Sequence, residues 1–286
     1  GRRGSRLGRD DGAGRRAVMT TAASTYPSRW RAPSIFGSPG RRLAFWALVC
    51  AYLVWSLSTL NVDTARMLAG LPRAWDILAR MMPPDFSRWH LLLTGMVESV
   101  QIAIAATIIG AVLSIPIGIA AAANLSPRPL YLLARGFIVI GRTFHEVIIA
   151  IFFVKLFGFG PVAGLLTLAF SSAIFLGKML AEDIENMKPG PVEAIRATGA
   201  SFGQTFFYAV VPQVLVKTLG VLIYRLDSNL RHSTVIGIVG AGGIGQTLSA
   251  SFSRYDFDFA SAILLTIAAM VAFGEWFSDW ARRRLR

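Results

Sequence analysis

The chain has 286 residues, of which 54% are hydrophobic and 16% are charged, and its mean hydropathy is +0.54. So few charged residues cannot cover the surface of a soluble domain of this size, so the composition excludes that class and predicts a polytopic membrane protein. The net charge of +13 raises the question of nucleic-acid binding. The basic N-terminal segment shows no recognisable nucleic-acid-binding fold, however, and we predict no nucleic-acid partner.

Residues 1–42 are rich in arginine, glycine, serine and proline, which predicts a disordered tail. Basic segments beside a span stay in the cytoplasm and contact anionic lipid, so we expect a cytoplasmic N-terminus and membrane lipid as a partner. The basic region ahead of Leu43 is too long for a cleaved signal peptide, and we expect the first span to remain as an anchor. The transmembrane domain is then expected to occupy residues 43–286.

Apolar segments of roughly 20 residues are needed to cross about 30 Å of hydrocarbon as a helix. Uncharged stretches that reach or approach this length lie at 43–60, 99–125 and 157–177. Further apolar stretches that contain charged residues lie at 136–156, 212–239 and 259–280. We therefore predict an all-α protein with about six transmembrane helices. Arginines near the end of the chain agree with a cytoplasmic C-terminus.

The loop at 61–90 is expected on the outer side of the membrane by this topology. Four arginines in it oppose the rule that basic residues stay inside: Arg66, Arg73, Arg80 and Arg88. Three aspartates offset them in part: Asp63, Asp76 and Asp85. The arginines of this loop are the feature that the topology explains least.

Ionisable residues inside the predicted spans are costly in hydrocarbon and usually line a pathway or pair with one another. The candidates for a translocation path are Arg142, Glu146, Arg225, Asn229, Arg231 and His232. Arg142 and Glu146 lie four residues apart, so mutual neutralisation on one helix face is the structural alternative. Around Asp227 the basic residues are in excess, which suits an oxyanion, although packing or snorkelling at a helix end explains them equally well.

A mostly polar insert at about 186–212 separates two apolar segments and predicts a helix-turn-helix. Pro189 and Pro191 fit a helix start, and Glu193 is then expected in the first turn, where a carboxylate suits the helix dipole. Gly199 fits a left-handed terminating residue. The orientation places this insert in the cytoplasm. The alternative is a solvated loop in which these residues serve only local capping.

The second helix of the insert is expected to start at Ser201, because Gln204 follows three residues later in a capping-box pattern. Pro212 fits the first turn of the next membrane helix.

A glycine-rich run contains Gly240, Gly242, Gly243 and Gly245 and formally satisfies the dinucleotide-binding pattern. That site requires a strand, a helix and a distant acidic residue, and neither the soluble βαβ context nor the acidic residue is present. A tight re-entrant turn or close helix packing explains the glycines instead, and an anion-binding nest of backbone amides is a third interpretation.

Enzymatic and metal chemistry have no evident position in the sequence. Cys50 is the one cysteine, and the histidines at 90, 145 and 232 have no ligand spacing. No Ser-His-Asp or paired-carboxylate arrangement stands out. We therefore predict no enzyme activity, no metal and no cofactor on this chain.

Several motifs together resemble one family. They are G-F-G-P-V-A-G at 158–164, L-G-K-M-L-A-E-D-I-E at 176–185, E-A-I-R-A-T-G-A-S at 193–201 and Y-R-L-D-S-N-L-R-H-S-T-V-I-G-I-V-G-A-G-G-I-G at 224–245. The combination is similar to the phosphonate (PhnE-type) branch of the permease subunits of ABC importers, over about residues 90–286. Two positions depart from the usual coupling motif, since Ile195 stands where a second alanine is common and Thr198 where aspartate is frequent.

The resemblance implies a type I importer (MetI-like) fold in the bacterial plasma membrane and a coupling loop that docks into an ATPase. The coupling residues that it implies are Glu193, Ala194, Ile195, Arg196, Gly199, Ala200 and Pro212. The implied partners are a second copy of the chain, two cytoplasmic ATPase subunits that carry ATP and Mg, and an extracytoplasmic substrate-binding protein.

The function predicted from these residues is ATP-driven import of phosphonate or a related phosphorus oxyanion, such as phosphate or phosphite. A permease for another small solute, such as a sulfonate, betaine or an amino acid, is the alternative within transporters. A passive anion channel with the glycine turn as its filter is a rival from another class, and a membrane enzyme is a further one.

Overall fold

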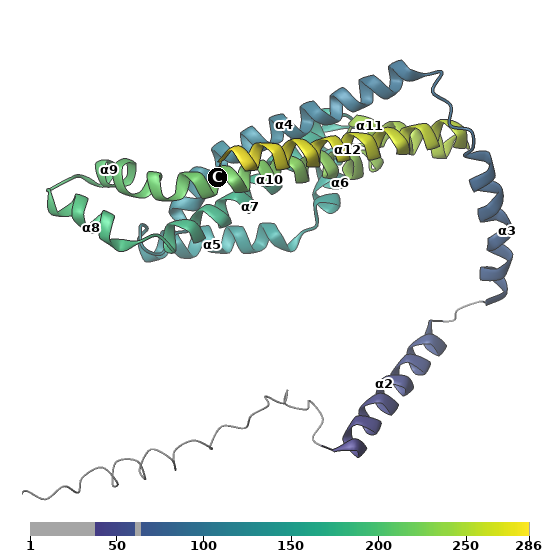
Figure 1. Ribbon diagram of the computed structural model, residues 1–286, viewed down its shortest axis with the longest axis horizontal. Coiled ribbons are helices and arrows are strands. Elements are labelled where there is room, and N and C mark those ends of the chain that lie inside the picture. Colours follow the sequence, from purple (N-terminus) through teal and green to yellow (C-terminus); the bar gives the residue numbers. More distant parts are fainter. Residues whose placement is uncertain (1–37, 61–63, 286) are drawn as a thin grey trace, which may run out of the picture. The chain divides into compact units, whose positions relative to one another are not determined.

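The computed structural model describes residues 38–60 and 64–285, and every regular element in these ranges is a helix. The chain divides into two units, residues 1–69 and residues 70–286 (Figure 1). The first contains α2 (Pro39–Thr59), and α3 (Thr64–Arg80) crosses the boundary. The second contains α4 (Trp89–Ala120), α5 (Arg128–Thr143), α6 (Glu146–Phe157), α7 (Pro161–Glu185), α8 (Pro189–Ala197), α9 (Phe202–Thr205), the π-helix η1 (Phe206–Val210), α10 (Val211–Ile238), α11 (Gly243–Ser253) and α12 (Phe257–Leu285).

The predicted tail at 1–42 lies outside the described residues except for its last five, of which residues 39–42 already belong to α2. Ser38 caps α2 by accepting a hydrogen bond from the backbone N–H of Arg41, and Pro39 follows in the first helical position. With these two capping features, α2 begins four residues before Leu43, where the apolar segment of the predicted span starts.

Five helical stretches in the described residues are long and apolar enough to cross a membrane: α2, α4, α7, α12 and the stretch that contains α10. A sixth crossing results if α5 and α6 are counted as one bent span. The all-α membrane fold and the number of spans are therefore confirmed. The span predicted at 136–156 is not one straight helix, because it is divided between α5 and α6, which meet at an angle of 91°.

The break between α5 and α6 has a local cause. Phe144 has an extended backbone, and His145 follows as the N-cap of α6 and accepts a hydrogen bond from the backbone N–H of Val147. The imidazole thus satisfies one donor of a new helix start, which an uninterrupted helix would not expose. Neither the extended backbone of Phe144 nor the capping by His145 can be recognised from the hydropathy of the segment.

Small residues let α4 and α7 pack closely. Ala106, Gly110, Ser114 and Gly118 recur every four residues on α4, and Ala169, Ala173, Gly177 and Ala181 do so on α7. All of these residues are buried. The hydrophobic effect does not drive helices together in lipid, so the van der Waals contacts that such close packing allows stabilise the pair instead.

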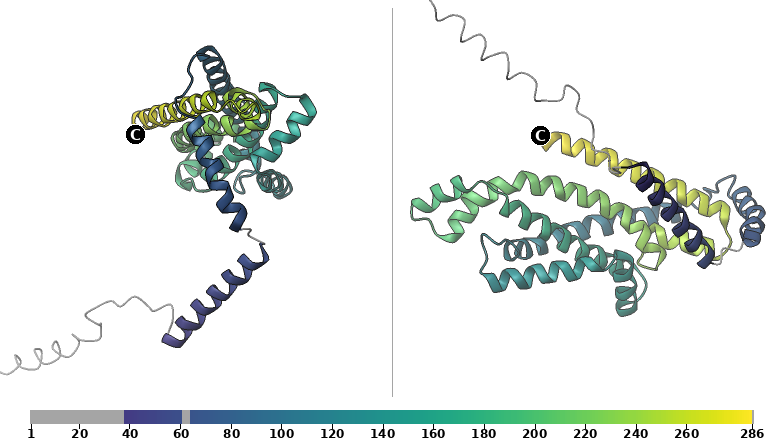
Figure 2. Two further views of the ribbon diagram at one scale, coloured as in Figure 1. Left: turned by 90° about the vertical axis from the view of Figure 1, so that its right-hand side faces the viewer. Right: turned by 90° about the horizontal axis from the view of Figure 1, so that it is seen from below.

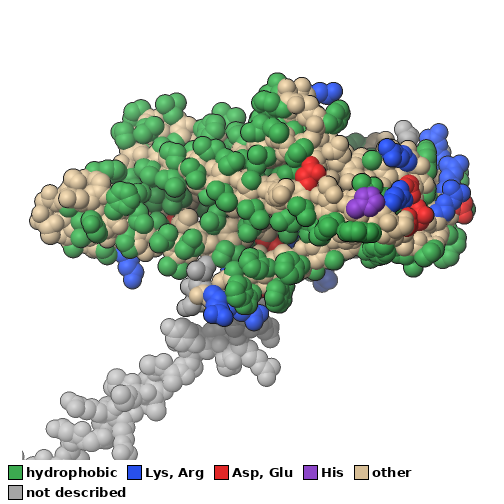
Figure 3. Space-filling view, turned by 90° about the horizontal axis from the view of Figure 1, so that it is seen from above, with side chains coloured by type: hydrophobic (Ala, Val, Ile, Leu, Met, Phe, Trp, Pro, Cys, Tyr) green, Lys and Arg blue, Asp and Glu red, His purple; other side chains and the backbone are tan. Residues whose placement is uncertain are grey.

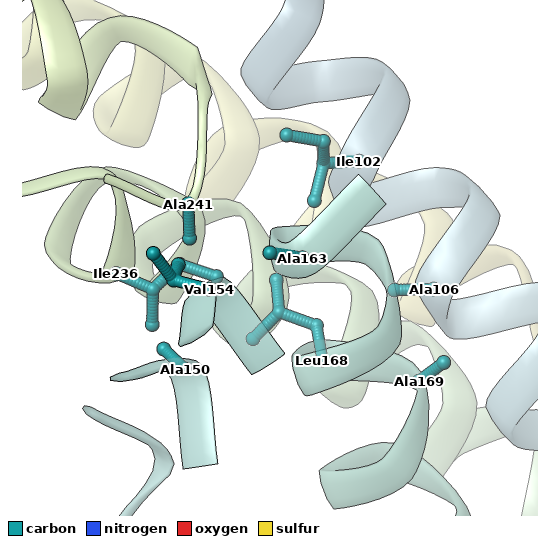
Figure 4. Close-up of a cluster of buried hydrophobic side chains, with 9 residues drawn as sticks. All are labelled: Ile102, Ala106, Ala150, Val154, Ala163, Leu168, Ala169, Ile236 and Ala241. Carbon is teal, nitrogen blue, oxygen red and sulfur yellow. The ribbon is translucent and has the colours of Figure 1, made fainter. Parts of the chain in front are cut away.

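The core of the second unit collects apolar side chains from α4, α6, α7 and α10. Ile102, Ala150, Val154, Leu168 and Ile236 belong to one buried cluster, in which small alanines fill the space between the larger side chains (Figure 4). On the face shown in Figure 3, hydrophobic side chains cover most of the surface and charged ones gather toward one end. Such a surface fits lipid better than water.

The helices α8 and α9 form a hairpin that projects from one end of the second unit (Figures 1 and 2). The turn between α10 and α11 lies toward the opposite end. At that opposite end the Arg88 guanidinium donates hydrogen bonds of 2.6 and 3.0 Å to the Asp256 carboxylate, and these lower the pKa of Asp256 below its usual range. The starts of α4 and α12 are thereby joined.

Replacing Gly110 by alanine is expected to destabilise the protein by about 1–3 kcal/mol, because the new Cβ would collide with the Cβ of Ser172 and approach the α7 backbone. Gly136→Ala on α5 is the matched control, since nothing lies within 4 Å of its Cβ position. Thermal unfolding of the purified protein in detergent measures both. A melting temperature for Gly110→Ala equal to that of Gly136→Ala would contradict the close packing.

Candidate functional site

A polar cavity of about 250 Å³ lies between α5, α6, α7 and α10. The residues that line it are Gly141, Arg142, Phe144, His145, Glu146, Ser171, Ile174, Phe175, Arg225 and His232. Four of the six residues predicted for a translocation path are among them, namely Arg142, Glu146, Arg225 and His232. The bend between α5 and α6 brings them together, because it turns the start of α6 toward α7 and α10.

Glu146 is the centre of a network of buried polar contacts. Its Oε1 accepts hydrogen bonds from the Arg225 guanidinium at 2.9 Å and from the Ser171 hydroxyl at 2.5 Å. Its Oε2 lies 2.5 Å from Nδ1 of His232. The structural alternative, in which Arg142 neutralises Glu146 on one helix face, is wrong, because the two residues belong to different helices and Arg225 pairs with Glu146.

The side chain of Arg225 is held in place by several neighbouring side chains. Its side chain is 5% exposed, its Nε donates to the Ser172 hydroxyl at 2.9 Å, and it lies over the ring of Phe175. The amide of Asn229 donates to the hydroxyls of both Ser172 and Thr107, at 2.8 Å each. Asn229, predicted for the path, does not line the cavity; it holds Ser172, which accepts a hydrogen bond from the lining residue Arg225.

Arg142 lines the same cavity from the end of α5, and its side chain is exposed. Among the described residues no salt bridge of Arg142 is found. Because Arg225 already compensates Glu146, the guanidinium of Arg142 is the cation that gives the cavity a positive balance. Guanidinium groups bind the oxygens of phosphorus oxyanions in a bidentate manner, so the cavity has the chemistry of an anion site.

Arg231 faces away from this cavity. Its guanidinium donates to Glu275 at 2.6 Å and lies 3.6 Å from Asp227. The predicted surplus of positive charge at Arg231 is therefore wrong, because α12 supplies a carboxylate that a count along one span does not include. Arg231 joins α10 to α12, and the structure gives it no position in the polar cavity.

The hairpin has the local structure that its sequence predicts. α8 ends before Gly199, which has a φ of 79°, and Ser201 and Gln204 form a complete capping box at the start of α9. Pro212 lies in the first turn of α10. The second helix departs from the prediction in one respect, since α9 continues through a π-helical turn into α10 without an intervening loop.

Glu193 lies outside the first turn, contrary to the prediction. α8 starts at Pro189, which makes Glu193 its fifth residue, and no acidic side chain lies in the first turn. Both prolines are tolerated near a helix start, so the sequence did not decide between Pro189 and Pro191. The carboxylate of Glu193 is exposed and does not serve the helix dipole.

The hairpin is fixed to the rest of the unit on one side and open on the other. Val192 is buried in a cluster with Ile184, Ala209 and Val210, against which Ile195 also packs. Five of the seven predicted coupling residues are exposed, namely Glu193, Ala194, Arg196, Gly199 and Pro212, and Ala200 is half-buried in the turn.

The side chain of Gln213, which the sequence analysis did not single out, closes the base of the hairpin. It accepts a hydrogen bond from the backbone N–H of Lys188 at 3.0 Å and donates to the carbonyl of the same residue. Only the fold brings these residues together.

The glycine run forms a tight turn and a close helix contact, two of the interpretations proposed for it. Gly240, Gly242 and Gly243 have positive φ angles, and a Cβ on Gly245 would collide with the backbone of Thr234. The hydroxyl of Ser99 accepts a hydrogen bond from the backbone N–H of Ile244 at 2.9 Å. This amide is occupied by the protein itself, which weighs against the anion-nest interpretation.

Comparison with known proteins identifies relatives of the chain. The profile of the family described as "binding-protein-dependent transport system inner membrane component" matches residues 114–286. The phosphate-import permease protein PhnE of Mycolicibacterium smegmatis is 44% identical over 211 residues, which cover 73% of this chain and 40% of that protein. The phosphite transport system permease protein PtxC of Stutzerimonas stutzeri is 39% identical over 226 residues, which cover 79% of this chain and 82% of that protein.

Solved structures show the same fold. A chain of the MetNI methionine ABC transporter in an inward-facing conformation has a TM-score of 0.61 at 21% identity, with 71% of this chain and 99% of that chain covered. A chain of an amino acid ABC transporter has a TM-score of 0.59 at 20% identity, with 71% and 100% covered. At these identities the likeness concerns the fold alone.

Proposed function

This chain belongs to the binding-protein-dependent transport system inner membrane component family, and we propose that it is the permease subunit of an ATP-driven importer of a phosphorus oxyanion. The observation that carries the proposal is its identity of 39–44% to permeases named for phosphate import and phosphite transport. The cavity supports the same cargo, because the guanidinium of Arg142 and the imidazoles of His145 and His232 line it. Phosphonate, phosphate and phosphite all carry negatively charged oxygens on phosphorus, which such donors bind.

The exposed side of the hairpin is proposed as the surface that transmits force from a separate ATPase, which carries the ATP and Mg. Glu193, Ala194 and Arg196 project from a helix whose opposite face is fixed to the bundle by Val192. The hairpin follows α7 and continues through α9 and η1 into α10, so a force on α8 would be passed to both of these helices. We propose further that two copies of the chain assemble with two ATPase subunits and an extracytoplasmic substrate-binding protein.

The polar cavity is proposed as a transient site on the translocation path. Arg142 would contact the oxyanion, and Arg225 would hold Glu146 so that its carboxylate does not compete for Arg142. Thr107, Ser172 and Asn229 fix the geometry from behind. Ionisable residues inside a membrane bundle usually pair with one another or line a pathway, and Arg142 is the charged residue of this cavity for which no ion pair is found among the described residues.

Transport by the purified complex in liposomes tests the proposed function. The complex of this chain with its ATPase is expected to accumulate radiolabelled phosphate or phosphite only when ATP and the binding protein are supplied. Uptake that proceeds without ATP and follows the concentration gradient would identify a passive channel. Uptake of a sulfonate or an amino acid in preference to every phosphorus oxyanion would contradict the proposed cargo.

The termini and the hairpin are proposed to face the cytoplasm. In a Cys50→Ala background, a cysteine at Ala197 on the exposed side of α8 is expected to resist an impermeant thiol reagent in intact cells. A cysteine at Ser87, which is exposed at the opposite end of the unit, is expected to react. Both positions should react after permeabilisation, which controls for local accessibility. Labelling at 197 but not at 87 in intact cells would reverse the orientation.

A further inference from the structure

Helix α3 has two chemically different faces along its whole length. Met67, Leu71, Trp75 and Leu78 follow the spacing of one helix face, and Met67, Leu71 and Trp75 are each more than 60% exposed. Arginines at 66, 73 and 80 recur every seven residues, which is two helical turns, and therefore form a stripe on the other face. Asp76 lies beside this stripe, so the helix carries three arginines against one aspartate.

The length and charge of α3 exclude a membrane crossing. Its 17 residues reach about 25 Å, and it is not among the described helices that are long and apolar enough to span. The match to the family profile covers residues 114–286 and so does not include α3. Neither the proposed ATPase coupling nor the oxyanion cavity uses it.

The chain holds α3 next to the membrane at both ends. Only four residues separate it from α2, and α2 is long and apolar enough to be a span. Eight residues lead from it to α4, and within them Asp85 donates its backbone N–H to the carbonyl of Asp258, near the start of α12. A helix tied between consecutive spans therefore lies within a short distance of one membrane surface.

We propose that α3 lies in the headgroup region of the bilayer, with its apolar face toward the acyl chains and its arginine stripe toward the lipid phosphates. The apolar face then leaves water without needing a protein partner, and Trp75 at its centre is a residue type enriched at that depth. The guanidinium groups of Arg73 and Arg80 bind phosphate oxygens and anionic headgroups. Two of the four arginines that oppose the positive-inside rule, Arg73 and Arg80, are thereby assigned to lipid headgroups, and a third, Arg88, is paired with Asp256.

Site-specific quenching in the full-length protein tests this placement. In the Cys50→Ala background, an environment-sensitive fluorophore is attached to Leu71→Cys, Leu78→Cys or Asp76→Cys, and each protein is placed in phosphatidylcholine and phosphatidylglycerol nanodiscs. Nitroxide groups on the acyl chains are expected to quench positions 71 and 78 at least about twofold more strongly than position 76. Equal quenching at all three positions overturns the proposal. Protection of position 78 from aqueous iodide without quenching by lipid also overturns it, and points to a protein partner.

The arginine stripe is tested by reversing its charge. Arg73→Glu with Arg80→Glu is expected to lower the lipid quenching at position 78, whereas the pair of lysine substitutions should retain most of it, because lysine keeps the attraction to phosphate. Size-exclusion profiles confirm that each variant is folded. Unchanged quenching in the charge-reversed variant overturns the assignment of these arginines to lipid headgroups. These readouts do not depend on transport, so the inference stands or falls independently of the proposed function.

Discussion

Arg142→Gln is expected to lower ATP-dependent oxyanion uptake by roughly tenfold or more while leaving assembly with the ATPase intact. A hydrogen bond to a charged group contributes about 1.5–3 kcal/mol, and about 1.4 kcal/mol corresponds to a factor of ten. Arg142 lines the cavity with an exposed side chain, so its replacement removes a ligand group without uncovering a buried partner. Initial rates of radiolabelled uptake in liposomes, with the complex quantified by size exclusion, measure the effect.

Arg231→Gln is the matched control for this prediction, because it removes the same charge from a guanidinium that is bound to Glu275 outside the cavity. Its uptake is expected to stay within about twofold to threefold of the parent, as befits a partly exposed ion pair. If Arg231→Gln lost as much uptake as Arg142→Gln, general electrostatics would explain the result and the cavity would lose its role. Normal uptake by Arg142→Gln would remove Arg142 from the proposed path.

Arg225 is a poor choice for the same test. It is buried against Glu146, Ser171 and Ser172, so its replacement leaves a carboxylate without its cation. Breaking a buried ion pair in this way costs about 3–5 kcal/mol in typical proteins, which makes loss of folding hard to separate from loss of transport. Arg142 and Arg225 line the same cavity, but only the replacement of Arg142 leaves no buried carboxylate without its cation, so Arg142→Gln is the variant that tests anion binding.

The hairpin could be predicted from the sequence because its determinants are local. The left-handed turn at Gly199 and the capping box of Ser201 and Gln204 depend on residues within a few positions of each other. The start of α8 is not determined in the same way, since Pro189 and Pro191 both fit a helix start; Glu193 is therefore predicted in the first turn although it is the fifth residue of the helix. The local residues therefore determine that this segment is a helical hairpin, but they do not determine at which residue α8 begins.

The polar cavity could be predicted only in part, because its pairing is not local. Glu146 binds a guanidinium 79 residues away along the chain, and Arg231 binds a carboxylate 44 residues away. A charge count along one span contains none of these partners. The break at Phe144 and His145 was not predicted either, because the segment is apolar enough for a continuous span and nothing in the hydropathy marks His145 as the residue that caps α6.

Gly199→Val is expected to uncouple ATP hydrolysis from transport, so that uptake per ATP hydrolysed falls about fivefold or more. Gly199 has a φ of 79°, and a side chain with a branched Cβ pays about 1–2 kcal/mol or more to adopt it. Nothing lies within 4 Å of the Cβ position, so the variant tests the backbone conformation and not a collision. Paired measurements of uptake and hydrolysis in liposomes, together with recovery of the complex, give the ratio.

Two further variants separate the shape of the turn from the identity of the surface. Gly203→Val introduces the same side chain four residues later, where the backbone is helical and the Cβ position is also open, so coupling should be close to that of the parent. Gly199→Asn should retain much of the coupling, because asparagine tolerates the left-handed conformation better than valine. Full coupling in Gly199→Val would show that α8 and α9 are held in register by the contacts of Val192 and Gln213 alone, and that the turn has no part in transmitting force. Loss in Gly199→Val with recovery in Gly199→Asn would instead trace coupling to the angle between the two helices.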